Sequence, residues 1–194
     1  MCHEILRDAR LWPLLLQIDL ELAERTCSQR CPFCGSALHR SDFPRKPRGA
    51  PDGLPEGYDR RLSFCCSSDG CRLRATSPSV RFACRKVYLH LVVVLVTALR
   101  QGPNDPGLST LKNLLGVDRR TVLRWQVWWK ERFPRTTFWA DACARFLPPL
   151  PREQLPATLL SAFGLPPWAL ETIQKLLLFL SPTTLLAGLQ MQGL

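Results

Sequence analysis

The feature that most constrains this chain is the stretch 27–79, which is rich in cysteine, glycine, proline and arginine. It holds few large aliphatic side chains, so it cannot bury enough apolar surface to fold unaided. Prolines and glycines are densest in residues 44–58, which predicts a long loop there. A segment of this composition needs a cross-link, and its cysteines are the residues that could supply one.

The first cysteine cluster reads CPFCG and contains Cys31, Cys34 and Gly35. Two thiolates separated by two residues can bind one metal ion together. A glycine directly after them supplies the positive backbone angle that lets amide groups point at sulfur. This spacing is typical of a zinc-binding turn.

The second cluster reads FCCSSDGC, and 31 residues separate Cys34 from Cys66. Ligand pairs two to four residues apart are the commoner kind, which favours Cys66 over Cys65 as the partner of Cys71. Cys65 remains an alternative ligand. We therefore expect one structural Zn²⁺, held as four thiolates whose binding supplies folding energy. The expected ligands are Cys31, Cys34, Cys66 and Cys71.

Cys27 and His39 are weaker candidates for the site. Unligated thiols and a redox-active CxxC pair are the competing interpretations, but a redox pair usually opens a helix in a βαβ unit. The first ten residues, MCHEILRDAR, mix charges without an apolar segment, so we expect no export signal and reduced cysteines. The expected location is the cytoplasm, or the nucleoid in a bacterium.

The charge distribution predicts a polyanion as partner. The formal net charge is +10, and all of the excess falls in residues 27–135. Arginine outnumbers lysine there, and the guanidinium fork matches phosphate oxygens two at a time. Arg72 and Arg74, next to the second cysteine cluster, are therefore expected to grip a DNA backbone. The alternative is an ordinary solubilising surface.

Residues 108–133, LSTLKNLLGVDRRTVLRWQVWWKERF, predict two helices with a turn at Gly116. Asp118 is placed to cap the second helix, expected from about Arg119 to Phe133 with a stop at Pro134. One face of it is apolar (Val122, Trp125, Trp129) and is expected to pack on Leu111, Leu114 and Leu115. A helix-turn-helix presents the opposite face to the major groove of DNA. The expected contacts are Arg119, Arg120, Thr121 and Arg124; a plain helical hairpin with a solvated basic face is the alternative.

Four segments follow from these patterns. They are an N-terminal helix (1–26) with Asp19 on its exposed side, a zinc ribbon (27–79), a helix-turn-helix domain (80–135) that opens with a helix from Arg85 to Gln101, and a Pro-interrupted helical tail (136–194). The fold class is mostly α with a small β zinc ribbon. The longest apolar run, 87–99, is shorter than the roughly 20 residues of a membrane span, so we expect it to be buried and no membrane to be involved.

The sequence CPFCG, then FCCSSDGCRLR, then LLGVDRRTVLRWQVWW, resembles the zinc-ribbon plus helix-turn-helix proteins of bacterial insertion sequences. The resemblance covers residues 27 to about 135 and is to the DNA-binding N-terminal part of transposases. It implies a four-cysteine zinc site and a recognition helix at the positions named above. Transposases of this kind also carry three metal-binding carboxylates on an RNase H-like sheet, and the tail offers only Asp141, Glu153 and Glu171 in a Pro-rich stretch.

The expected function is therefore non-catalytic DNA binding, associated with a transposable element. Its apolar tail is expected to contact a protein partner or a second copy. The alternatives are a zinc-stabilised protein–protein adaptor and an RNA-binding module. No Ser/His/Asp set and no phosphate-cradling glycine loop is legible, so we do not expect an enzyme.

Overall fold

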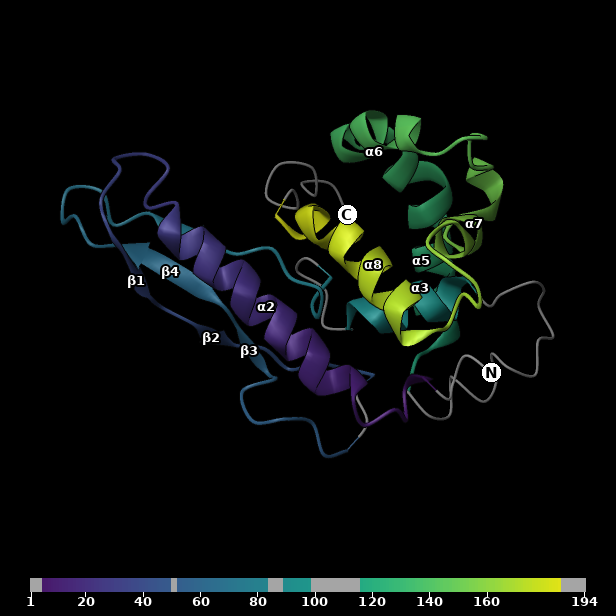
Figure 1. The fold of residues 1–194 in the computed structure, drawn as a ribbon, viewed down its shortest axis with the longest axis horizontal. Coiled ribbons are helices and arrows are strands. Elements are labelled where there is room, and N and C mark those ends of the chain that lie inside the picture. The colour runs from purple at the N-terminus through teal and green to yellow at the C-terminus, as the bar shows by residue number, and fades with distance from the viewer. Residues whose placement is uncertain (1–4, 50–51, 84–88, 99–115, 186–194) are drawn as a thin grey trace.

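The structure is a computed structural model that describes residues 5–49, 52–83, 89–98 and 116–185. Figure 1 shows short antiparallel strands at one end of the molecule and a group of helices at the other, with helix α2 running along the strands toward the helices. The described residues are mainly helical with small antiparallel sheets. This confirms the expected mixture of mostly α structure with a little β.

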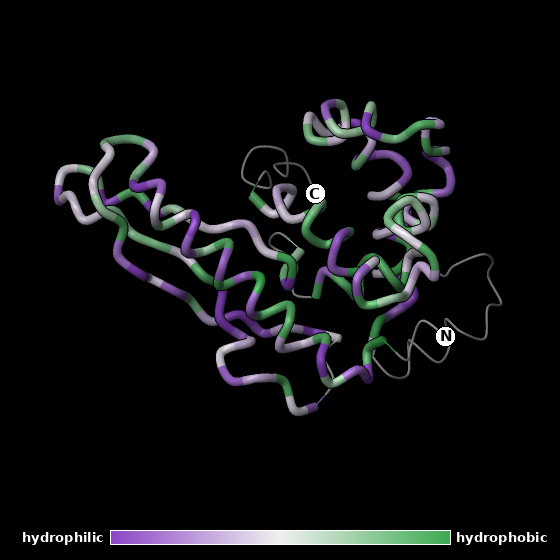
Figure 2. Tube along the Cα trace, viewed as in Figure 1, coloured by the Kyte–Doolittle hydropathy of each residue, from purple (hydrophilic) through white to green (hydrophobic). Residues whose placement is uncertain are grey.

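Helix α2 (Leu11–Ser28) belongs to both ends of the molecule. Leu11 and Ile18 are buried in the core formed with the helices, whereas Ala23 is buried in a second core beneath the strands. Figure 2 shows hydrophobic bands recurring along this helix between hydrophilic ones. The expectation that Asp19 faces solvent is wrong, because its carboxylate is fully buried. Residues adjacent to an apolar stripe lie only 100° away from it and can fall within a wide buried face.

A buried ion pair ties α2 to the segment that follows the strands. Nε of Arg81 donates to Asp19 at 2.7 Å, and neither side chain is more than 1% exposed. Ser79 Oγ and the backbone N–H of Val80 donate to the same carboxylate at 2.5 and 2.7 Å. The other guanidinium nitrogens donate to backbone carbonyls, including that of Tyr58 at 2.6 Å. Both buried charges therefore have their hydrogen bonds satisfied, as burial of ions requires.

The strands form two small antiparallel sheets. The larger has the order β1-β4-β5, with β1 at Leu38–Arg40, β4 at Ser63–Cys66 and β5 at Arg74–Thr76. The smaller pairs β2 (Phe43–Pro44) with β3 (Arg60–Arg61). The strands are short because the loops between them carry the prolines and glycines.

The two faces of the larger sheet differ in character. Leu38 pairs with Cys66 across β1 and β4, and both side chains are buried with Phe64 in the core beneath α2. Side chains alternate along a strand, so Cys65 lies on the other face, where it pairs with His39. The buried face therefore holds the sheet against α2.

Helix α3 (His90–Ala98) is the central helix of the helical part. Its residues from His90 to Thr97 are all buried, and α5, α7 and α8 contact it. A helix that is apolar all round is expected to be enclosed in this way. The expected start at Arg85 is wrong, because Leu89 forms an antiparallel bridge with Phe82 and the helix begins after it. Residues 84–88 and 99–101 of the expected helix lie outside the described residues.

Helix α5 (Arg119–Val127) runs on into a π-helical turn, Trp128–Arg132, and a 3-10 turn, Phe133–Arg135. The expected stop at Pro134 is therefore wrong in detail. That proline occupies the first turn of the 3-10 segment, where its missing N–H is not needed.

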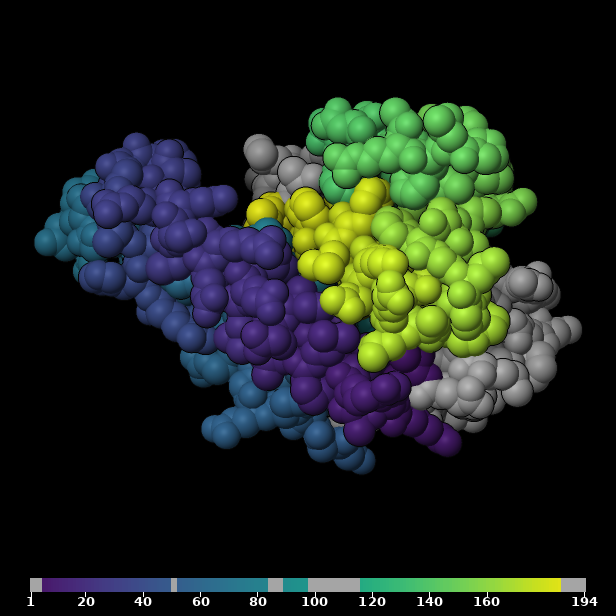
Figure 3. Space-filling view, viewed as in Figure 1, coloured from purple at the N-terminus to yellow at the C-terminus, as the bar shows by residue number. Residues whose placement is uncertain are grey.

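The tail consists of short helices. They are α6 (Thr137–Ala142), α7 (Ala157–Ala162) and α8 (Leu170–Leu180), with 3-10 turns at Cys143–Arg145, Arg152–Gln154 and Ser181–Thr184. Figure 3 shows atoms of the N-terminal helix directly against those of the C-terminal helical segment, and leucines of both are members of one core. The tail is thus part of the fold.

Apolar side chains of α7 and α8 contribute to that core. Leu159 of α7 and Ile173 of α8 are fully buried, whereas Trp168, just ahead of α8, is 41% exposed. Partner contact through the tail stays a prediction. Among the described residues, Leu147 and Leu165 are the most exposed of its large apolar side chains. Among those residues, we find no helix with the length and apolar character needed to cross a membrane.

Candidate metal centre and nucleic-acid interface

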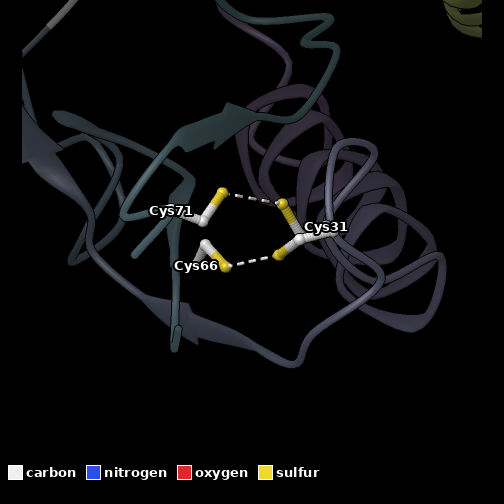
Figure 4. A group of neighbouring side chains, drawn as sticks. Cys31, Cys66 and Cys71 are labelled. Atoms are coloured by element: carbon white, nitrogen blue, oxygen red, sulfur yellow. Dashed lines mark hydrogen bonds between the residues drawn. The ribbon is translucent and has the colours of Figure 1, made fainter. Parts of the chain in front are cut away.

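Four cysteine side chains converge where the two cysteine turns meet. Cys31 and Cys34 lie on the turn between α2 and β1, Cys66 ends β4, and Cys71 lies on the turn before β5. Their sulfur atoms all lie within 4.8 Å of one another. Figure 4 shows the labelled Cys31, Cys66 and Cys71 pointing toward a shared centre. The four ligands predicted from the sequence are thus the four that the fold brings together.

The spacing of these sulfur atoms suits a metal ion. Cys31 and Cys71 have their Sγ atoms 3.7 Å apart, and Cys34 and Cys66 have theirs 3.4 Å apart. A disulfide would need about 2.05 Å. Four thiolates around a tetrahedral ion at about 2.3 Å lie about 3.8 Å from one another. The group can therefore hold one metal ion.

Backbone amides point at sulfur in the first turn. The N–H of Cys31 donates to the carbonyl of Ser36 at 2.9 Å, and that of Gly35 donates to the carbonyl of Cys31 at 2.9 Å, which closes the turn. Gly35 has a φ of +71°, as the sequence argument requires. The N–H groups of Cys34 and Phe33 lower the pKa of the Cys31 thiol, and hydrogen bonds from Ser36 lower that of Cys34 to about 6. This turn favours thiolates.

The second turn repeats this geometry with different residues. The backbone N–H of Ser68 donates to Cys66 Sγ at 3.4 Å, and that of Cys71 donates to the Ser68 carbonyl at 3.0 Å. Arg72 takes the place that Gly35 has in the first turn, with a φ of +49°. Burial raises the pKa of the Cys66 thiol to about 12. A bound cation offsets that cost, because a coordinating thiol is deprotonated outright.

The remaining candidate ligands lie apart from the four-sulfur group. Cys65 is on the opposite face of the sheet and donates to the carbonyl of Arg72 at 3.5 Å. Cys27 donates to the carbonyl of Leu38 at 3.6 Å. His39 is exposed opposite Cys65. The alternation of side chains along β4 is what separates Cys65 from Cys66.

The arginines after the second cluster have different environments. Arg72 is exposed and lies 3.6 Å from a carboxylate oxygen of Asp69. Arg74 donates to the carbonyl of Ser41 and to Ser63 Oγ, both at 2.8 Å, and its guanidinium lies over the ring of Phe43. Arg74 on β5 therefore also connects this strand to β4 and to the segment after β1. The sequence pattern indicated only a contact with DNA for this residue.

The start of α5 has the geometry expected of it. Gly116 has a φ of +59°, Val117 is buried, and the Asp118 carboxylate accepts from the backbone N–H of Arg120 at 2.8 Å. On the inner face Val122, Trp125 and Trp129 are at most 3% exposed. The N-terminal cap and the buried stripe agree with the sequence pattern.

The predicted DNA-contacting residues divide into two groups. Arg119, Arg120 and Arg124 are exposed. Thr121 is only 7% exposed, and its hydroxyl accepts from the Arg124 guanidinium at 3.0 Å, so it positions that arginine. The first helix of the pair, 108–115, lies outside the described residues, together with the three leucines expected to pack on α5.

Asp19 and Arg81 form a buried ion pair that the sequence argument missed. A carboxylate next to the apolar face of a helix was the available signal.

Comparisons of the chain with protein-family models, with curated proteins and with solved structures gave no match.

Proposed function

We propose that this protein is a non-catalytic DNA-binding module whose four-cysteine site holds one structural Zn²⁺. Four thiols whose sulfur atoms all lie within 4.8 Å of one another are a donor set for zinc or an iron–sulfur centre, and ligand pairs on two short turns are typical of structural zinc sites. Bound zinc would cross-link β1, β4 and β5 in a segment that has only a small apolar core. The cytoplasm, where thiols stay reduced, suits such a site.

The observation that carries the proposal is the division of α5 into two faces. Its inner face is buried, whereas Arg119, Arg120 and Arg124 are exposed behind a capped N-terminus. In a helix-turn-helix this part of the second helix enters the major groove. Arginine there binds guanine edges bidentately or holds phosphate.

Two exposed apolar side chains extend the same surface. Leu123 is 40% exposed and Val127 is 45% exposed. With Arg120 and Arg124 they share one side of α5, since residues three and four apart are neighbours on a helix. Apolar side chains in the major groove contact thymine methyl groups. The exposed face of α5 would thus read both guanine and thymine.

The arrangement of the tail supports a role without catalysis. Asp141, Glu153 and Glu171 are exposed on three different elements, α6, a 3-10 turn and α8. Two-metal nucleases instead need carboxylates gathered around ions roughly 4 Å apart. Leucines of α7 and α8 are buried in the core of this chain. With the resemblance to insertion-sequence proteins, these features favour a regulator or binding subunit of a mobile element.

Fluorescence anisotropy with a labelled duplex tests the proposal. Replacing Arg119, Arg120 and Arg124 together by Ala should weaken binding about a hundredfold and reduce the slope of log affinity against log salt by about 3. The control removes the same charge from exposed arginines elsewhere, Arg132, Arg135 and Arg145. An equal loss in both variants would mean unspecific charge attraction. No loss in either would favour the adaptor, and tighter binding of RNA competitor would favour the RNA-binding module.

A further inference from the structure

A basic groove lies beside the metal centre, between the last turns of α2 and strand β5. Its volume is about 400 Å³, within the range of sites that hold small ligands. Arg25 and Arg30 line it, together with three uncharged polar residues and five apolar ones, and none of its lining residues is acidic. The C-terminal end of a helix carries only about half a negative charge. The two arginines outweigh it, so the groove suits an anion.

Arg30 is held in an unusual conformation at this groove. Its φ is +61°, a left-handed value that residues other than glycine seldom adopt. Its N–H donates to the carbonyl of Cys27 at 3.1 Å, and it directly precedes the metal-site residue Cys31. Strained backbone of this kind persists where the surrounding structure fixes it, and an observed outlier is a reason to look for function.

An exposed aromatic ring follows the groove in the chain. Pro32 lines the groove, and the next residue, Phe33, is 75% exposed. Phe33 sits between Cys31 and Cys34, so a metal ion bound to both would hold its backbone in place. Among the described residues it is the most exposed aromatic side chain. Exposed aromatic rings next to positive grooves are the means by which proteins bind unpaired bases and the backbone that connects them.

We propose that this groove and Phe33 form a binding site for single-stranded DNA. Arg25 and Arg30 hold phosphates in the groove, and Phe33 stacks on an unpaired base. The inference rests on the proposed function, because it takes DNA as the partner. It adds a second contact, made by the cysteine-turn end of the molecule and distinct from the duplex contact of α5. A protein that handles the ends of a mobile element would meet both forms of DNA.

The test compares full-length protein variants by anisotropy with labelled oligothymidylate and with a labelled duplex. Phe33→Ala should weaken single-strand binding about tenfold and leave duplex binding unchanged, whereas Phe33→Trp should retain both. Arg30→Asn should also weaken single-strand binding about tenfold, because asparagine tolerates the left-handed backbone but lacks the charge. Controls of matched exposure in the tail are Leu165→Ala and Arg152→Gln. Metal content and circular dichroism of each variant establish that the cysteine site is intact.

A stacking signal separates direct contact from a structural effect. An oligonucleotide with one 2-aminopurine should lose fluorescence when wild-type or Phe33→Trp protein binds it, and should not do so with Phe33→Ala. If Phe33→Ala and Arg30→Asn bind oligothymidylate as tightly as wild type, the inference fails while duplex binding by α5 still stands. Tighter binding of oligouridylate than of oligothymidylate would overturn the assignment to DNA. If the variant without the three α5 arginines loses duplex binding but still binds oligothymidylate, the two sites are separate, as proposed.

Discussion

Replacing Asp19 by Asn is expected to destabilise the protein more than any other isosteric change on α2. The carboxylate is fully buried and accepts three hydrogen bonds, at 2.5, 2.7 and 2.7 Å, from Ser79, Val80 and Arg81. Asparagine has nearly the same shape but no charge, and its amide nitrogen would face donors. Arg81, 1% exposed, cannot release its proton and would be left as an unpaired buried cation.

The magnitude follows from that environment. Removing one partner of a buried ion pair costs about 3–5 kcal/mol, because the other charge stays desolvated. Domains are stable by only about 5–15 kcal/mol in total, so the variant should lose about a fifth or more of its free energy of unfolding. Arg81 keeps its carbonyl acceptors, including Tyr58, which places the expected loss toward the lower end, about 3 kcal/mol.

Urea unfolding followed by circular dichroism, on metal-loaded protein, measures this loss. Glu21→Gln on the exposed side of the same helix is the control and should change stability by less than about 0.5 kcal/mol. The double variant Asp19→Leu with Arg81→Met should be more stable than Asp19→Asn alone, since it removes both buried charges. A cost below about 1 kcal/mol for Asp19→Asn, or a double variant less stable than the single one, would refute the reasoning.

Three further changes probe other parts of the fold. Cys34→Ser should lose the bound metal ion and Cys65→Ser should keep one equivalent, as metal analysis of the purified proteins would reveal; equal loss in both would contradict the assignment of ligands. Gly116→Ala should lower the free energy of urea unfolding by about 1 kcal/mol, because an alanine at a φ of +59° is strained, and an unchanged midpoint would speak against that. Leu95→Ala in α3 should cost about 2–5 kcal/mol in the same assay, whereas Leu147→Ala, at an exposed site, should be nearly neutral; similar values for the two would contradict the central position of α3.

The four-cysteine group was predictable because its evidence is local. Cys31 and Cys34 are two residues apart in a turn closed by Gly35, and such a turn has few alternatives. The choice of Cys66 over Cys65 also followed from spacing, and strand alternation explains it. The cap at Asp118 was equally local, since a cap needs only its own helix.

The misses concern contacts between distant parts of the chain. Asp19 pairs with Arg81, 62 residues later, and no periodicity within α2 signals a partner that far away. The start of α3 was misplaced because Leu89 is bound outside the helix. It bridges Phe82, and its backbone N–H donates to the carbonyl of Arg48, 41 residues earlier, at 3.2 Å. Local propensity is a weak prior that tertiary contacts override.

Helix α2 gives this chain a property that neither of its cores has alone. At 18 residues it is about 27 Å long, and it lies in the strand core with one end and in the helical core with the other. Because both cores share α2, removing a metal ion bound at the cysteine turns should loosen the leucines around α3 as well. The chain should melt in one step, and metal supply would set the lifetime of the whole molecule.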